Sequence, residues 1–80
     1  MGINQYNENR ERHGFWETHF DNGQIDFRGL YKNGFRYGFW ESFDLNGKLI
    51  WSGNYDKSFR TKLWKIYMIG GKLHRKEFYL

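Results

Sequence analysis

Stretches of about nine to eleven residues rich in aromatic and β-branched side chains alternate with short turn signals along the chain. Each stretch is long enough for one strand, and none contains proline, which central strands exclude. The turn signals are Asn-Gly, Gly-Gly and Lys-Ser pairs at residues 22–23, 33–34, 46–47, 57–58 and 70–71. Asn-Gly and Gly-Gly readily adopt the positive φ angles of tight hairpin turns. The pattern therefore predicts an all-β, antiparallel meander of about six strands, at residues 11–21, 24–32, 35–45, 48–56, 59–69 and 72–80.

The side chains of the first hairpin predict its register. If Asn22-Gly23 is a two-residue turn, the pairs on one face are Phe20 with Ile25, Thr18 with Phe27, Trp16 with Gly29 and Gly14 with Tyr31. The pairs on the other face are His19 with Asp26, Glu17 with Arg28 and Phe15 with Leu30, so that opposite charges meet. The same folding of the second hairpin gives Trp40 with Gly53, Ser42 with Trp51 and Asp44 with Leu49. An indole opposite a glycine covers the backbone that the glycine exposes, which predicts a structural role for this pair.

The same motif recurs every 24 residues. Gly14-Phe15-Trp16-Glu17 returns as Gly38-Phe39-Trp40-Glu41, and then in degraded form as Lys62-Leu63-Trp64-Lys65. Self-similarity at a fixed period is typical of repeat proteins, in which each unit buries its apolar face against its neighbours. The chain is thus predicted to be one domain, residues 1–80, with repeats at 14–37, 38–61 and 62–80. Residues 1–13 form a partial unit, of which residues 1–5 are expected to be frayed.

These motifs, together with Asp21-Asn22-Gly23-Gln24-Ile25 and the run from Gly29 to Gly34, resemble the MORN-repeat superfamily. Within it, the chain is most similar to the bacterial and viral branch labelled the YwqK-type antitoxin. The resemblance covers residues 6–80 and implies an elongated, twisted antiparallel sheet without catalytic residues. It implies docking of protein partners, association with acidic lipids in some members, and toxin neutralisation in the branch named. Lys62, Lys65 and Glu77 depart from the pattern, as suits a terminal unit whose outer side meets solvent.

Composition narrows the class of protein. With 80 residues and no cysteine, the core must come from large side chains, and aromatic residues make up 22% of the chain. The sequence has no apolar run long enough to span a bilayer, and its first residues lack the apolar stretch of a signal peptide, so the expected location is the cytoplasm.

Catalytic and metal-binding signals are weak. His13, His19 and His74 lack the spacing of metal ligands, no serine lies in a nucleophile motif, and no glycine-rich phosphate loop is present. Glu17 and Glu41 occupy equivalent positions, so they could flank a sugar as glycosidase carboxylates do, but an exposed charge ladder is favoured. The sequence therefore predicts no enzyme, no metal and no cofactor.

The net charge of +4 is concentrated in the second half of the chain. Residues 1–40 hold five basic and five acidic side chains, whereas residues 41–80 hold eight and four. In the last hairpin the basic and aromatic residues expected on one face are Lys65, Tyr67, Lys72, His74 and Lys76, with Tyr67 opposite His74. Such a surface can bind phosphate, single-stranded nucleic acid, nucleotide or acidic lipid. A solubilising cap that blocks sheet-to-sheet association is the alternative interpretation.

A second candidate surface lies on the face opposite the tryptophans. Its members form an expected apolar strip of Phe15, Leu30, Phe39, Phe43 and Ile50, with Phe43 opposite Ile50. Exposed strips of this kind are protein docking sites, unless the sheet curls and partly buries both faces. The sequence predicts a non-catalytic protein that recognises another protein stoichiometrically, of the antitoxin, immunity or inhibitor type. An anionic-ligand module is the alternative, and open edge strands also favour a homodimer.

Overall fold

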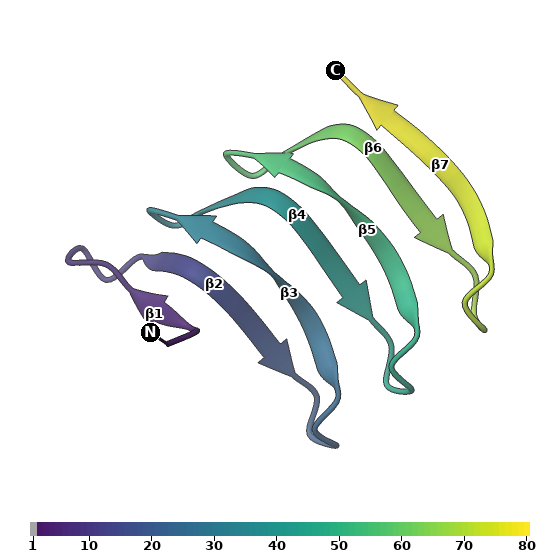
Figure 1. Cartoon of the computed structure of the whole chain (residues 1–80), viewed down its shortest axis with the longest axis horizontal. Helices are drawn as coiled ribbons and strands as arrows, with labels where there is room; N and C mark the ends of the chain where they lie inside the picture. Colours follow the sequence, from purple (N-terminus) through teal and green to yellow (C-terminus); the bar gives the residue numbers. More distant parts are fainter. Residues whose placement is uncertain (1) are drawn as a thin grey trace.

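The computed structural model describes residues 2–80, which form one antiparallel sheet (Figure 1). Its seven strands are β1 (Gln5–Tyr6), β2 (Arg12–His19), β3 (Ile25–Lys32), β4 (Phe35–Phe43), β5 (Leu49–Asp56), β6 (Phe59–Tyr67) and β7 (Leu73–Tyr79). Each strand pairs with the next in the sequence, so the chain is a meander in the order β1 to β7. The predicted all-β meander is confirmed, with one strand more than expected because the short β1 adds to the edge of β2.

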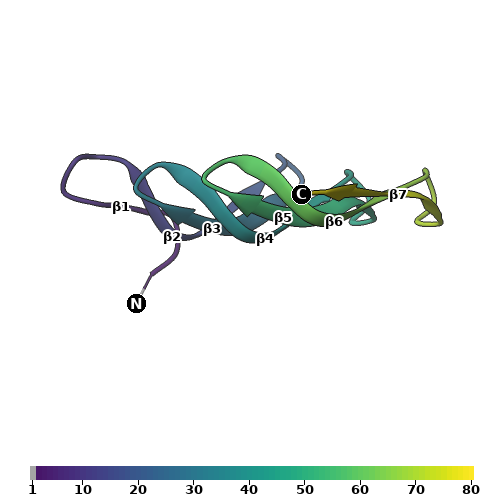
Figure 2. The same cartoon turned by 90° about the horizontal axis from the view of Figure 1, so that it is seen from above.

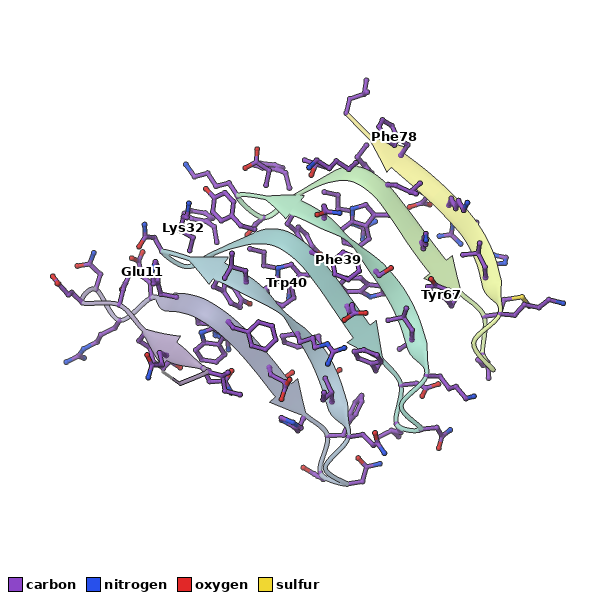
Figure 3. All side chains as sticks on the ribbon, in the orientation of Figure 1. Glu11, Lys32, Phe39, Trp40, Tyr67 and Phe78 are labelled. Atoms are coloured by element: carbon purple, nitrogen blue, oxygen red, sulfur yellow. The ribbon has the colours of Figure 1, made fainter. Side chains whose placement is uncertain are left out.

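The sheet is a single layer. The molecule measures 41 × 36 × 16 Å, and the view from above shows the strands side by side, with no second layer of residues 2–80 over either face (Figure 2). The strands are bent along their length, as Figure 1 shows. We call the face that carries Trp16, Trp40 and Trp64 the inner face, and the opposite one the outer face. Phe39 and Trp40, neighbours in β4 (Figure 3), show the contrast: 54% of the first is exposed and 0% of the second.

The predicted register holds in the middle of the hairpins. Gly14 pairs with Tyr31, Trp16 with Gly29 and Thr18 with Phe27, and in the second hairpin Trp40 pairs with Gly53 and Ser42 with Trp51. Phe15 with Leu30 and Glu17 with Arg28 are likewise opposite each other. The sequence therefore correctly predicted how side chains of β2 to β5 alternate between the two faces of the sheet.

Next to three of the turns the predicted register is wrong. The loop at Asn22-Gly23 is one residue longer than expected: Phe20 N–H donates to Gln24 O, Gly23 N–H donates to Phe20 O, and only Gly23 has a positive φ there. This combination is the three-residue hairpin loop with a glycine bulge. His19 consequently pairs with Ile25, not with Asp26.

The same hydrogen bonds recur at Asn46-Gly47 and Gly70-Gly71, where Asp44 and Met68 hold the position of Phe20, although Gly70 as well as Gly71 has a positive φ. Phe43 therefore pairs with Leu49, so the expected pairs Asp44 with Leu49 and Phe43 with Ile50 are wrong. The turns at Asn33-Gly34 and Lys57-Ser58 are shorter, because Lys32 pairs with Phe35 and Asp56 with Phe59. Both of their central residues have positive φ angles, as a two-residue hairpin turn requires.

The indole rings cover glycines of the preceding unit. A Cβ on Gly29 would lie 2.1 Å from the ring of Trp40, and a Cβ on Gly53 would lie 2.1 Å from the ring of Trp64. The expected cross-strand partner is thus present in the register, but the indole that lies on each glycine comes from the next repeat. The register shifts at both glycines, between β3 and β4 and between β5 and β6. Each shift leaves space on the inner face that a single indole fills.

The indole N–H groups complete this contact. Trp40 Nε1 donates to Leu30 O at 3.2 Å, and Trp64 Nε1 donates to Asn54 O at 3.0 Å. Both carbonyls belong to the residue after the covered glycine, at the irregular point of the ladder. A buried indole N–H needs a partner, and here it binds the preceding unit. The contact therefore fixes how successive repeats pack.

An arginine and a tyrosine cover each indole on the solvent side. The guanidinium groups of Arg12, Arg36 and Arg60 lie 4.4, 4.5 and 4.8 Å from the ring centres of the tryptophans four residues later. Each also donates to the hydroxyl of a tyrosine nineteen residues later, at 3.1–3.2 Å. Cation–π contacts of this kind stabilise by about 0.5–2 kcal/mol. They explain how Trp40 is buried without a second layer.

The N-terminal segment replaces a preceding repeat for the first indole. Trp16 Nε1 donates to Gln5 O at 3.0 Å, and the ring of Tyr6 packs edge-on at 5.2 Å. Asn4 N–H donates to Phe15 O, and the Asn4 side chain both donates to and accepts from the backbone of Glu17. The expected fraying is therefore wrong for residues 4 and 5, while Met1 lies outside the described residues.

The C-terminal unit departs from the repeat at Glu77 and Lys62. Glu77 stands where Gly29 and Gly53 stand in earlier units, so no further indole could lie on the backbone there in the same way. Lys62 stands where Gly14 and Gly38 stand, and it keeps their left-handed conformation with φ at 61°. A residue with a Cβ in this region costs about 1–2 kcal/mol.

Replacing Gly29 or Gly53 with alanine should reduce the free energy of unfolding by about 1–3 kcal/mol, because the added methyl group overlaps an indole. Trp40→Ala should cost about 3–5 kcal/mol as a large-to-small change in the core. Urea unfolding measures the free energy of unfolding of each variant.

Phe39→Ala in the same strand as Trp40 is the control, since its ring is exposed and its loss should cost less than about 1 kcal/mol. A Gly29→Ala protein as stable as the parent would show that Trp40 does not lie on Gly29.

Lys62→Gly should raise the free energy of unfolding by about 0.5–1 kcal/mol, because the relief of left-handed strain exceeds the entropy that glycine adds to the unfolded chain. Thermal melts compare it with Lys62→Ala, which keeps the Cβ and should bring no gain. Equal melting temperatures for the two variants would contradict the assigned strain.

Candidate binding surface

The outer face carries a row of apolar side chains that crosses most of the sheet. Phe15 on β2, Leu30 on β3 and Phe39 on β4 are all exposed, which decides between the exposed strip and the partly buried face that the sequence left open. Leu63 on β6 and Phe78 on β7 continue the row beyond the predicted strip. We call these five residues the apolar row. Figure 3 shows Phe39 and Phe78 on their two strands.

The 24-residue repeat could have predicted that Leu63 and Phe78 belong to the apolar row. Leu63 follows Phe15 and Phe39 at intervals of 24 residues, and Phe78 occupies the position of Leu30 in the third unit. Leu63 and Phe78 are opposite each other in the β6–β7 ladder, as Phe15 and Leu30 are in the β2–β3 ladder. Applying the period to the outer face as well as to the tryptophans would have found them.

Phe43 and Ile50 lie beside this row, at the end of the sheet near the longer turns. Phe43 is half-buried, and the guanidinium of Arg28 lies 5.2 Å from its ring centre. With Gln24, Ile25, Arg28 and Gly47, it lines a hollow of about 130 Å³. Ile50 is exposed but does not pair with Phe43. The structure therefore places Phe39, and not Phe43, as the exposed aromatic side chain in the middle of the sheet.

A charged row runs next to the apolar row on the outer face. Reading from β2 to β7, the register aligns Glu17, Arg28, Glu41, Ser52, Lys65 and Lys76. Arg28 stands between the two glutamates and binds Glu41 at 2.9 Å, while Glu17 contacts His19 at 3.3 Å. This arrangement favours the charge ladder over a pair of catalytic carboxylates. The row changes from mixed charge in β2 to β4 to positive in β6 and β7.

The basic hairpin is less compact than expected. Lys65 and Lys76 pair directly across β6 and β7, as predicted. Tyr67, however, pairs with Leu73, because the longer Gly70-Gly71 loop shifts the register. Tyr67 is half-buried, and Lys72 and His74 are exposed near the turn. Among residues 2–80 no carboxylate lies within 4 Å of Lys65 or Lys76, so no ion pair neutralises these two neighbouring charges.

Glu77 joins the inner-face residues of the last two strands. It accepts a hydrogen bond from the Tyr79 hydroxyl at 2.7 Å and binds Arg75 at 2.9 Å, with Arg60 at 3.9 Å. The hydroxyl of Tyr79, then Arg75, lower the pKa of Glu77 from its ordinary value. Hydrogen bonding to Tyr79 raises the pKa of Arg60. The pKa of Arg36 is also raised, because the hydroxyls of Tyr31 and Tyr55 outweigh the opposing effect of burial.

Within residues 2–80, no group of three His, Asp or Glu side chains is arranged to hold a metal ion. The same residues include no helix with the length and apolarity needed to cross a bilayer. Three comparisons with known proteins were made, and no family model, curated protein or solved structure matches the chain. The resemblance to MORN repeats thus rests on the repeated motif of the chain and remains a prediction.

The Glu77 contacts predict a pH dependence. Because the folded-state pKa of Glu77 is depressed, its contribution is present at neutral pH and is lost as the pH falls below about 4.5 and through the folded-state pKa. The parent should therefore lose stability on acidification more steeply than Glu77→Gln. Urea midpoints at pH 7 and pH 3 measure the difference. If both proteins lose the same stability, Glu77 does not have the assigned role.

Proposed function

We propose that this chain is a non-catalytic binding protein that recognises another protein stoichiometrically through its outer face. The observation that carries the proposal is the apolar row on a sheet that has no second layer over it among residues 2–80. The tryptophans of the inner face are buried by contacts within the sheet, whereas Phe39 and Phe78 in the apolar row are more than half exposed. Contiguous apolar patches of this kind are typical of protein interaction sites.

The charged row supports a partner of defined chemistry. Lys65 and Lys76 border the apolar row without a neutralising carboxylate among residues 2–80. A partner with acidic side chains beside an apolar patch would match both rows, with the apolar contacts giving affinity and the lysines speeding association. An antitoxin, immunity protein or inhibitor acts in this way, by occupying a surface of its target. This class follows from the resemblance, and the partner chemistry follows from the two rows.

Phe39→Asp should weaken binding at least about thirtyfold, because loss of a central aromatic anchor costs about 2 kcal/mol or more. The tagged parent, Phe39→Asp and Leu45→Asp are compared for stoichiometric capture from the source cells. The captured protein is then titrated against each variant by calorimetry. Leu45 is the matched control, since it is exposed in a turn and lies outside the apolar row. Equal affinity for all three proteins, with unchanged melting temperatures, would contradict docking through this face.

Binding of an anionic ligand is the second candidate function, and the unneutralised pair of Lys65 and Lys76 is the observation that favours it. Phosphate contacts release counterions, so binding through two lysines should weaken roughly tenfold between 50 and 200 mM salt. Fluorescence anisotropy with single-stranded RNA, single-stranded DNA and acidic vesicles measures this, with Lys65→Glu/Lys76→Glu as the matched variant. The absence of binding at 50 mM salt would refute this function and leave protein docking unaffected.

A further inference from the structure

The apolar row is interrupted between Phe39 on β4 and Leu63 on β6. Asn54 on β5 and Thr61 on β6 are paired there, and both side chains are half-buried. A hollow of about 340 Å³ opens at this point, lined by Gly38, Asn54, Tyr55, Asp56, Thr61 and Lys62. It is larger than the hollow beside Phe43 and lies between exposed apolar side chains.

The first repeat shows what the hollow replaces. Leu30, Lys32 and Tyr37 occupy, 24 residues earlier, the positions of Asn54, Asp56 and Thr61. In the first repeat the ammonium of Lys32 lies 5.2 Å from the ring centre of Tyr37, so large side chains fill the region. The second repeat puts smaller polar or acidic residues at all three positions. The equivalent position in the first repeat is therefore a natural comparison in which side chains of the protein fill the hollow.

The inner face nearby does not share these changes. Gly53, Tyr55 and Trp64 repeat Gly29, Tyr31 and Trp40 in identity and in contacts. Beside the hollow, the inner face thus keeps the repeat at these three positions, while the outer-face lining changes. Lys62, which lines the hollow, holds a left-handed φ of 61° where earlier repeats have glycine. Backbone strain of this kind concentrates at ligand sites.

The lining offers both hydrogen-bond donors and acceptors. No hydrogen bond or ion pair joins the side chains of Asn54, Asp56, Thr61 or Lys62 to another of residues 2–80. Asp56 and Lys62 carry opposite charges, so a charged ligand would be attracted by one and repelled by the other. A neutral group that both donates and accepts can use all four side chains.

We propose that the hollow is a recognition subsite for a carboxamide, the side chain of an Asn or Gln residue that the partner protein inserts between Phe39 and Leu63. The carboxamide N–H groups donate to Asp56 and Asn54, and its carbonyl accepts from the Thr61 hydroxyl and from Lys62. Partner residues on either side of it contact the apolar row. This subsite rests on the proposed function, and it gives that function specificity, because a partner without the carboxamide would leave the four polar groups unpaired in the interface.

The experiment titrates a small probe into the full chain and needs no partner. The probe is N-acetyl-glutamine methylamide, added to about 100 mM because so small a group binds no tighter than millimolar. Amide shifts in NMR spectra should be saturable and centred on Gly38, residues 54–56 and residues 61–62. The matched variant is Asn54→Leu/Thr61→Tyr, which installs the residues of the first repeat. It should melt no lower than the parent and should lose the shifts.

The capped forms of leucine, glutamate and lysine are the comparison probes, and each should shift the same amides less than capped glutamine. Absence of shifts at these residues would overturn the proposal, as would equal shifts with capped leucine or with the filled variant. Larger shifts with capped glutamate or lysine would assign the subsite to a charged group and refute the carboxamide. None of these outcomes depends on docking by Phe39, so failure of the subsite and failure of the proposed function are distinguishable.

Discussion

The contact between an indole and the glycine of the preceding repeat is the constraint on which this fold depends. A single-layer sheet has no second sheet or helix to bury its side chains, and domains are normally built from at least two layers. Here Trp40 and Trp64 lie directly on the backbone of Gly29 and Gly53, and their N–H groups bind the adjacent carbonyls. The arginine and tyrosine of each repeat then cover the ring. Every repeat thus supplies a core side chain to the repeat before it.

Because the core contacts all lie on the inner face, the outer face is free to bind a partner. Since the repeats are held together by inner-face contacts, outer-face positions can change without loss of the fold. The apolar row keeps the 24-residue period at Phe15, Phe39 and Leu63, while Asn54 and Thr61 break it. The first and last repeats also differ from the middle one in their inner-face contacts. Residues 4–6 provide the contacts of a preceding repeat for Trp16, and Glu77 removes the glycine that a following indole would need.

Much of the fold could be predicted from the sequence, because strand alternation, turn residues and the repeat all indicate the same register. The central pairs from Gly14 with Tyr31 to Ser42 with Trp51 depend only on that alternation. The errors lie where local backbone geometry decides the length of a turn or the pairing of strands.

Asn22-Gly23 forms a three-residue loop and Asn33-Gly34 a two-residue turn, although the two sequence pairs are identical. The glycines have the predicted cross-strand partners, but the indole that covers each glycine comes from the next repeat, because the register shift that brings Trp40 onto Gly29 leaves no signal in the pairing pattern. On the outer face the sequence predicted the apolar strip, but it could not show that Phe43 is covered by Arg28.

Hydrogen exchange at the four indole N–H groups, followed by NMR, tests this account most directly. Trp16, Trp40 and Trp64 each donate to a backbone carbonyl of the preceding segment, whereas none of residues 2–80 accepts a hydrogen bond from Trp51 Nε1. The account predicts slow exchange at Trp40 and Trp64, as slow as in the global unfolding limit, and fast exchange at Trp51. Exchange at Trp40 and Trp64 as fast as at Trp51 would show that the indoles do not join the repeats, and would contradict the single-layer core.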